Sequence, residues 1–247
     1  MKSEFLYVGH RGTRTHFDEN TINAFEKAIE YGANCIEFDV RRTKDNKLVI
    51  LHDPKLDRTT NSSGLLKDLY YSEIKNISTK NHKNTIPLLS EVLNLLKGKT
   101  LFMIELKDDN IKEEVLSIVK NYNLLEDCIF SGRNLNELGE IKKVYHNSRI
   151  CYNLTKGLDF DISEFLKFDS PTKFKIKPDF ISLRSNLTSK KFIEICHDYK
   201  IKALAWDFIH YKDPIFEIKW LIDMGINGIL FDNHANITTI KSWVASA

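Results

Sequence analysis

Short apolar runs alternate with amphipathic segments along almost the whole chain. Eight of these runs have the pattern of β-strands, and apolar residues recur at helical spacing in the segments between them. The predicted strands cover residues 5–10, 35–40, 101–106, 128–132, 149–153, 180–184, 202–208 and 228–232. The predicted helices cover residues 22–32, 86–98, 113–123, 136–145, 189–200 and 215–225.

This alternation of strands and helices indicates parallel β/α units. Eight units in 247 residues predict a TIM (β/α)8 barrel that forms a single domain over residues 1–247. A doubly wound open sheet is the alternative. The glycine-rich GxGxxG turn of a dinucleotide-binding sheet is absent from the sequence.

A further strand-like run covers residues 47–53. Only seven residues separate Val40 from Leu48, which is too few for a crossover between parallel strands. We therefore expect the second barrel strand to continue into an antiparallel hairpin.

The turn of this hairpin determines which residues face each other. With Asp45 and Asn46 as a two-residue turn, Asp39 is expected to lie opposite His52. The polar, turn-rich segment 54–85 follows the hairpin and is predicted to be a small insertion over the barrel mouth.

Several predicted strands end in charged residues. Residues two apart on a strand point to the same side of the sheet, and the functional residues of TIM barrels lie at the C-terminal ends of strands. One rim is therefore expected to gather three carboxylates, two histidines, an arginine and a lysine: Glu37, Asp39, Glu105, His10, His52, Arg11 and Lys107.

Each of these residues also has a purely structural interpretation. Acids two apart often lie on a solvated edge, Glu105 can pair with Lys107, and Trp206 can belong either to the core or to a binding site. A buried ion pair adds little net stability, so several charges in one barrel mouth favour chemistry. We interpret the other histidines as hydrogen-bonded surface residues: His16, His82, His146, His197, His210 and His234.

The chemistry of this rim follows from its residue types. Three carboxylates without cysteine or histidine ligands suit a hard cation, Mg²⁺ or Ca²⁺, better than zinc. Arg11 offers a planar fork for phosphate oxygens, and Lys107 adds a compact positive charge. His10 and His52 can supply one acid and one base. Together these groups predict metal-dependent phosphoryl transfer.

Composition narrows the possible partners. The chain is 42% hydrophobic and 28% charged, which excludes disorder, and its basic residues are scattered at a net charge of +2. We therefore expect a small-molecule substrate and no nucleic acid. No apolar stretch approaches the ~18 residues of a membrane span, so stable membrane insertion is not expected. A homodimer is left open.

The termini and the cysteines indicate the compartment. The chain enters an apolar run within four residues of Met1, which leaves no room for a signal peptide. The four cysteines lie far apart and form no CxxC pair, so we expect reduced core thiols rather than disulfides or a zinc site. A soluble cytoplasmic protein is predicted.

A set of spaced motifs resembles the glycerophosphodiester phosphodiesterase family. The resemblance extends from the first predicted strand to the eighth, and it implies a TIM barrel with a small insertion after the His-Asp motif. The implied activity is metal-dependent hydrolysis of glycerophosphodiesters to glycerol 3-phosphate and an alcohol. The motifs are His10-Arg11-Gly12, residues 19–25, Glu37-Phe38-Asp39-Val40, His52-Asp53 and Glu105-Leu106-Lys107.

The resemblance also implies a role for each matching residue. The cofactor would be one divalent cation, Mg²⁺ or Ca²⁺, with Mn²⁺ as a third candidate. The nucleophile would be the substrate's own glycerol 2-hydroxyl, so that a cyclic phosphate forms and water then opens it. The roles are the acid/base pair for His10 and His52, metal ligands for Glu37, Asp39 and Glu105, phosphate binding for Arg11 and Lys107, support of the binding residues for Glu19 and Asn20, and the aromatic side chain of the site for Trp206.

The sequence departs from the family pattern in three places. Asp18 stands where the family has proline, Gly132 follows Ser131 where the family has phenylalanine, and residues 206–209 read Trp-Asp-Phe-Ile instead of Trp-Thr-x-Asn. These changes concern the alcohol end of the substrate. The alternatives are therefore a lysophospholipase D-like or sphingomyelinase D-like enzyme, or a catalytically silent phosphate-binding barrel.

Overall fold

The strands of the computed structural model, which describes residues 5–170 and 174–246, follow the predicted order. Each of the eight predicted barrel strands is present within two residues of its expected bounds, and the run predicted over 47–53 forms a shorter strand, β3. The strands are β1 (Leu6–Gly9), β2 (Cys35–Arg42), β3 (Leu48–Ile50), β4 (Leu101–Leu106), β5 (Cys128–Gly132), β6 (Arg149–Asn153), β7 (Phe180–Arg184), β8 (Lys202–Trp206) and β9 (Gly228–Phe231).

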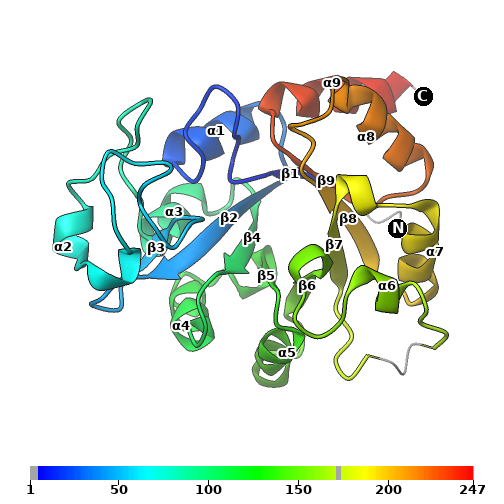
Figure 1. The fold of residues 1–247 in the computed structure, drawn as a ribbon, viewed down its shortest axis with the longest axis horizontal. Coiled ribbons are helices and arrows are strands. Elements are labelled where there is room, and N and C mark those ends of the chain that lie inside the picture. The colour runs from blue at the N-terminus through cyan, green and yellow to red at the C-terminus, as the bar shows by residue number, and fades with distance from the viewer. Residues whose placement is uncertain (1–4, 171–173, 247) are drawn as a thin grey trace.

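These strands form one sheet that closes on itself. Its order is β1-β9-β8-β7-β6-β5-β4-β2-β3, and pairing of β1 with β2 completes the barrel. All pairs around the barrel are parallel, and only β3 joins β2 antiparallel. The helices form the outer ring (Figure 1). The prediction of a TIM barrel is confirmed.

The helices begin where polar side chains satisfy free backbone N–H groups. Thr21, Asn134, Ser189 and Asp213 each accept a hydrogen bond from the backbone N–H three residues further on. No helix of the described ranges has the length and apolar character of a bilayer span. The helices are α1 (Ile22–Glu30), α2 (Tyr71–Ile74), α3 (Leu89–Leu96), α4 (Lys112–Asn121), α5 (Leu135–Val144), α6 (Ile162–Phe165), α7 (Lys190–Asp198), α8 (Pro214–Asp223) and α9 (His234–Ser246).

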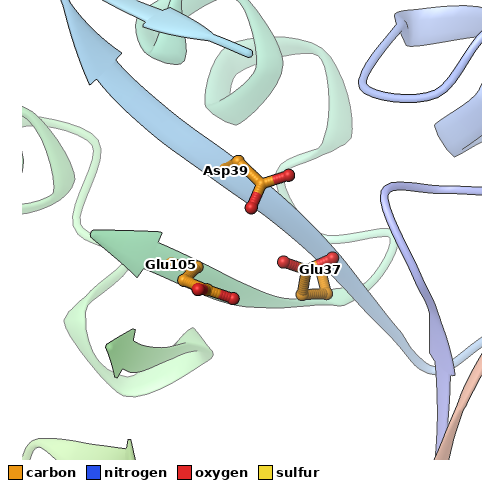
Figure 2. A group of neighbouring side chains, drawn as sticks. All are labelled: Glu37, Asp39 and Glu105. Carbon is orange, nitrogen blue, oxygen red and sulfur yellow. The ribbon is translucent and has the colours of Figure 1, made fainter. Parts of the chain in front are cut away.

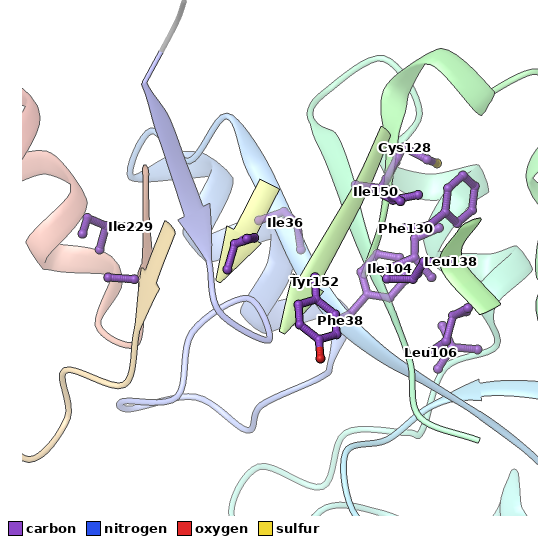
Figure 3. Packing of buried hydrophobic residues seen from close by; sticks show 14 of the residues in the cluster. Ile36, Phe38, Ile104, Leu106, Cys128, Phe130, Leu138, Ile150, Tyr152 and Ile229 are labelled. Atoms are coloured by element: carbon purple, nitrogen blue, oxygen red, sulfur yellow. The ribbon is translucent and has the colours of Figure 1, made fainter. Parts of the chain in front are cut away.

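Alternation along β2 separates the outer core from the barrel interior. Ile36 and Phe38 pack against the helices together with apolar residues of β4, β5 and β6 (Figure 3). Cys35 belongs to a second cluster inside the barrel, and Glu37 and Asp39 continue that inward face toward the mouth. The interior is thus apolar at its base and charged at the C-terminal ends of the strands.

The cysteines of the chain are free and buried. Burial raises the pKa of the Cys128 thiol to about 12. The cysteines lie in the core as predicted, whereas their reduced state, a cytoplasmic location and a homodimer stay predictions.

The hairpin forms, but its register differs by one residue from the predicted one. Val40 lies opposite Ile50, and the backbone N–H of Leu51 donates to the carbonyl of Asp39 at 3.0 Å. Asp39 therefore faces Leu51, and the predicted pairing of Asp39 with His52 is wrong.

The loop of the hairpin explains this shift. Thr43 N–H donates to the Lys47 carbonyl at 2.9 Å, so the loop contains three residues rather than two. Asn46, the third, has φ +60° and provides the left-handed position that such loops need.

The segment 54–85 lies beside this hairpin, at the outer end of β2 (Figure 1). It contains a short 3₁₀ helix, Leu66–Asp68, and α2. Leu56 and Ile74 of this segment pack with Val49 of β3 in a small apolar cluster of their own. The insertion is therefore anchored on the hairpin.

Asp18 ties the insertion to the loop after β1. Its carboxylate accepts four hydrogen bonds from the far end of the insertion, and these bonds hold its pKa below the usual range although burial opposes the shift. The family's proline could accept none of them. The donors are Thr79 Oγ1 at 2.6 Å, Asn81 Nδ2 at 2.9 Å, the His82 backbone N–H at 2.9 Å and Asn84 Nδ2 at 3.3 Å.

Candidate active site

A cavity of about 300 Å³ opens at the C-terminal ends of the barrel strands. One wall comes from the ends of β1, β2 and β4 and from the end of the hairpin. The other wall comes from β5 to β8. Seven of the ten predicted site residues line it: His10, Arg11, Glu37, His52, Glu105, Lys107 and Trp206.

The three predicted metal ligands converge beside this cavity. Asp39 and Glu105 are neighbours across the β2–β4 pair, and Glu37 lies two residues below Asp39 on the same face of β2 (Figure 2). One carboxylate oxygen from each lies within 4.8 Å of the others. All three side chains are buried, with residue exposures of 2%, 1% and 8% for Glu37, Asp39 and Glu105.

Crowding of these acids separates their protonation behaviour. Burial, followed by the charges of Asp39 and Glu105, raises the pKa of Glu37 well above its usual value. Burial also opposes ionisation of Asp39, but Lys107 and Arg11 outweigh it and hold the pKa of Asp39 below its usual range. The three carboxyl groups thus offer more negative charge than Arg11 and Lys107 neutralise.

The donor set fits a hard divalent cation. Asp39 Oδ1 is buried and accepts no directed hydrogen bond from the described residues, although Lys107 Nζ lies 3.0 Å away. Oxygen ligands from three carboxylates suit Mg²⁺ or Ca²⁺. Glu37, Asp39 and Glu105 are the residues that would hold such an ion.

Arg11 and Lys107 lie against the same acids. Arg11 follows β1 at φ +51°, and its backbone N–H donates to Glu37 Oε2 at 2.9 Å. Its guanidinium contacts Glu19 Oε1 at 2.8 Å and Asp39 Oδ2 at 3.2 Å. Lys107 Nζ donates to Glu105 Oε1 at 2.6 Å. Both cations are therefore held at the cavity wall.

Gly12 makes the turn after β1 possible. It has φ +76°, and a Cβ at this position would lie 2.6 Å from the backbone of Ala24. Only glycine fits this conformation and this close approach to α1.

Glu19 and Asn20 lie behind the cavity wall rather than in it. Asn20 Nδ2 donates to Asp39 Oδ2 at 2.8 Å, which fixes the carboxylate orientation. Glu19 accepts from both Arg11 and Arg58, and these bonds lower its pKa to about 2 against the effect of burial. Their contacts are those of positioning residues.

The two histidines share one arrangement. His10 Nδ1 lies 2.8 Å from Asp232 Oδ1, and His52 Nδ1 lies 2.5 Å from Asp53 Oδ1. A carboxylate only accepts, so each Nδ1 carries the hydrogen and Nε2 is left to exchange a proton with a substrate. A paired aspartate of this kind also stabilises the imidazolium when it forms.

The surroundings of His52 favour its neutral form. Burial lowers its pKa most, Arg11 and Lys107 lower it further, and Asp39 and Asp53 oppose the shift, with a result of about 4. Near pH 7 its imidazole is therefore neutral and can accept a proton.

Comparison with known proteins identifies the family. Residues 10–236 match the glycerophosphoryl diester phosphodiesterase family. The chain belongs to this family.

Individual relatives agree with this assignment. The glycerophosphodiester phosphodiesterase of Caldanaerobacter subterraneus subsp. tengcongensis is 31% identical over 240 residues, which cover 92% of this chain and 94% of the relative. The crystal structure of the glycerophosphodiester phosphodiesterase of Thermotoga maritima has a TM-score of 0.77 at 28% identity and covers 96% of this chain and 98% of its own.

A third comparison concerns the fold alone. An Oleispira antarctica phosphodiesterase, solved in complex with the product sn-glycerol-3-phosphate, has a TM-score of 0.80 at 21% identity and covers 96% of both chains. The predicted enzyme class, glycerophosphodiester phosphodiesterase, is confirmed by the family and by its named members.

Trp206 belongs to both the core and the cavity lining. It is 9% exposed, packs with the apolar interior of the barrel and lines the cavity. Arg184 lies over its ring at 5.0 Å, and His10 meets it edge-on with 6.1 Å between the ring centroids. It belongs to the wall built by β5 to β8.

Sequence reasoning missed most of that second wall. Single serines and asparagines do not stand out in a sequence, and the available signal was their position at the last residues of predicted strands. His210, which we interpreted as a surface residue, is exposed at the cavity lip, whereas His234 is buried against Thr13 and not on the surface. The lining residues of this wall that were not predicted as site residues are Ser131, Asn153, Lys156, Ser182, Arg184 and Asp207, and Arg14 and Arg58 were missed on the opposite side.

Proposed function

We propose that this chain hydrolyses glycerophosphodiesters to glycerol 3-phosphate and an alcohol with His10 and His52 as its acid–base pair. One divalent cation, Mg²⁺, Ca²⁺ or Mn²⁺, is held by the three carboxylates of β2 and β4. The observation that carries this proposal is the matched pair of aspartate-bound histidines at one cavity with the three-carboxylate cluster. A binding module has no need of such a pair.

The positively charged side chains Arg11 and Lys107 bind the phosphate. The cation held by the carboxylates supplies Lewis-acid polarisation of the phosphate oxygens when it is bound. Arg11 uses Nη1 and Nε for Glu19 and Asp39, and the remaining N–H groups of its five donors are available to the substrate. Lys107 adds a positive charge beside Glu105.

His52 acts as the base and His10 as the acid in the first step. The glycerol 2-hydroxyl attacks phosphorus, and its proton passes to Nε2 of His52, which is neutral at pH 7. The bond from phosphorus to the alcohol oxygen breaks, and Nε2 of His10, whose Nδ1 lies 2.8 Å from Asp232 Oδ1, donates the proton that the departing oxygen needs.

Water completes the reaction in the second step. His10 now takes a proton from water, which attacks the cyclic phosphate, and His52 returns its proton to the 2-oxygen as the ring opens. The products are glycerol 3-phosphate and the free alcohol, and both histidines regain their starting states. An attacking hydroxyl that belongs to the substrate gains effective molarities up to ~10⁵–10⁸ M.

The proposal is tested by product identity and by a deoxy substrate. With Mg²⁺, Ca²⁺ or Mn²⁺ present, glycerol 3-phosphate release from a panel of glycerophosphodiesters is measured, with lysophosphatidylcholine and sphingomyelin as competing substrates. Phosphorus NMR should show a transient cyclic phosphate, and the 2-deoxy analogue should turn over orders of magnitude more slowly. Equal kcat for the deoxy analogue would mean direct attack by water.

If no substrate of the panel is hydrolysed, the remaining alternative is a catalytically silent phosphate-binding barrel. Release of a lysophospholipid headgroup or of ceramide phosphate, without any turnover of glycerophosphodiesters, would move the substrate to the lysophospholipase D-like or sphingomyelinase D-like class. Each outcome therefore selects one of the three alternatives.

A further inference from the structure

The cavity wall formed by β5, β6, β7 and β8 differs in chemistry from the wall that holds the acids. Ser131, Asn153 and Ser182 contribute hydroxyl and amide groups from the ends of β5, β6 and β7. Asn153 and Ser182 are direct neighbours across the β6–β7 pair. We call these three residues together with Trp206 the neutral wall.

Two polar atoms of the neutral wall have no partner among the described residues. They are the donor Trp206 Nε1 and the acceptor Asn153 Oδ1. Both residues are more than nine-tenths buried, with exposures of 9% and 7%. A buried polar atom without a hydrogen bond costs about 1–3 kcal/mol. A ligand hydroxyl, which both donates and accepts, complements such a pair.

The aromatic face that could bind a quaternary ammonium is already covered. The Arg184 guanidinium lies 5.0 Å from the centroid of the Trp206 ring, and Asp207 holds it there through a 3.1 Å contact to Arg184 Nε. The rest of the indole packs in the barrel interior. Choline-type cations are bound by open aromatic faces, and Arg184 already occupies one face of this ring.

The lip above the neutral wall is positively charged. Lys156 lines the cavity and has no ion pair with the residues that the structure describes. Partial burial, and then the charges of Lys107 and Arg133, lower the pKa of Lys156, with a further contribution from Arg184, and these effects outweigh the opposing charge of Glu105. The field at this lip opposes a cationic group and favours a neutral or anionic one.

We propose that the neutral wall binds the alcohol half of the substrate and selects hydroxylated, non-cationic alcohols over quaternary ammonium alcohols. Glycerol and inositol represent the first class, and choline represents the second. This inference rests on the proposed phosphodiesterase function. Arg184 is its specificity-determining residue because it covers the indole face and adds positive charge at the lip.

The test compares two diesters that differ only in the alcohol. Glycerophosphoglycerol and glycerophosphocholine are assayed with the full chain and saturating divalent cation, and glycerol 3-phosphate is measured for both. We expect kcat/KM to favour glycerophosphoglycerol by about tenfold or more, the size of effect that one cation–π site or one unpaired polar contact produces.

Arg184→Ala opens the indole face and removes one positive charge. The ratio of the two kcat/KM values should shift toward glycerophosphocholine by roughly 3–10-fold, mainly through a lower KM for that substrate. Arg184→Gln, which keeps much of the side-chain packing, should shift the ratio in the same direction. Lys120→Ala is the charge-matched control. Lys120 is exposed and lies in the last turn of α4, at the opposite end of the barrel from the cavity. The ratio of the two kcat/KM values should therefore not change in this variant.

Asn153→Ala tests the hydroxyl contact separately. It should lower kcat/KM for glycerophosphoglycerol by about tenfold more than that for glycerophosphocholine, since choline presents no hydroxyl to Asn153 Oδ1. Unfolding midpoints of all variants are measured to check that they fold. A general loss of folded protein lowers kcat/KM for both substrates equally, so it cannot change the ratio of the two values.

The outcomes separate this inference from the function on which it rests. A wild-type enzyme that prefers glycerophosphocholine or treats both diesters alike overturns the inference and leaves the phosphodiesterase intact. An unchanged ratio in both Arg184 variants also overturns it. If neither diester yields glycerol 3-phosphate with divalent cation present, the proposed function is refuted instead.

Discussion

The two walls of the cavity use their polar groups in opposite ways. In the wall from β1, β2 and β4, charged groups pair with one another: Arg11 with Glu19 and Asp39, and Lys107 with Glu105. In the neutral wall, a donor and an acceptor have neither a hydrogen bond nor an ion pair with the described residues, whereas Arg11 Nε and Asp39 Oδ1 are at least ion-paired. A network of mutually paired charges holds its geometry before any ligand binds. Unpaired polar groups, in contrast, are available to form hydrogen bonds with a ligand.

This difference separates the chemistry of the site from its selectivity. Removing one member of a buried charge network leaves another charge uncompensated, which is costly. Removing one hydroxyl from the neutral wall removes one contact to the ligand. We therefore expect large effects on turnover from the charged wall and small effects from the neutral wall.

Loss of the divalent cation should have the largest effect. Exhaustive chelation should lower kcat/KM by roughly 10⁴-fold, because metal stabilisation of phosphoryl-transfer charge is worth several kcal/mol. Mg²⁺, Ca²⁺ or Mn²⁺ should restore activity to the wild type but poorly to Glu37→Ala. The Glu37→Ala variant should still fold, because the change relieves repulsion among three buried acids. Full activity after chelation would contradict the assigned role of the carboxylates.

Each histidine should contribute nearly as much. His10→Ala or His52→Ala is expected to lower kcat by about 10²–10⁴-fold, the range of a positioned acid or base. The double variant should lose less than the product of the two losses, because both residues serve one proton relay. Near-normal kcat in either single variant would remove that histidine from the pair.

The pH profile should distinguish His52 from an ordinary histidine. A base must be neutral, so kcat/KM falls as pH decreases through its pKa, which here is about 4 rather than 6.5. Arg11 and Lys107 oppose protonation of the ring, while Asp39 and Asp53 favour it. With saturating metal, kcat/KM should stay nearly constant from pH 6.5 to pH 5.5 and fall about tenfold for each pH unit below 4. An acid limb centred near 6.5 would contradict this assignment.

A single hydroxyl of the neutral wall should matter least. Ser182→Ala should lower kcat/KM for glycerophosphoglycerol by only about 2–10-fold, the equivalent of one hydrogen bond of 0.5–1.5 kcal/mol. Glu105→Ala, a matched truncation in the charged wall, should cost far more. Equal losses in the two variants would abolish the functional distinction between the walls.

The barrel and the charged wall were predictable because their signals are local. Glu37 and Asp39 lie two apart in an otherwise apolar strand, and that pattern indicates both the strand and the face that carries them. The helix α9 was missed because only three of its residues, His234, Ile237 and Ile240, are buried, which leaves a weak apolar period.

The remaining features depend on contacts between distant segments. Asp232 was visible at the end of the last strand, but its bond to His10 joins residues 222 positions apart. The hairpin register depended on one backbone conformation, the left-handed Asn46, which a sequence allows but does not require. The neutral wall depended on the register of the β6–β7 pair, which makes neighbours of Asn153 and Ser182 although they lie 29 positions apart in the chain.

Asp18 has a consequence for the motion of the mouth. Through its bonds to residues 79–84 it joins the far end of the insertion to the loop that carries Glu19 and Asn20, and Asn20 in turn grips Asp39. An insertion fastened at this point does not swing as an independent lid. Opening it would loosen the side chain that orients Asp39, so we expect local opening of the insertion and loss of the carboxylate geometry to form one cooperative event. We therefore expect a substrate to meet a mouth that is already assembled, without a separate lid-closing step.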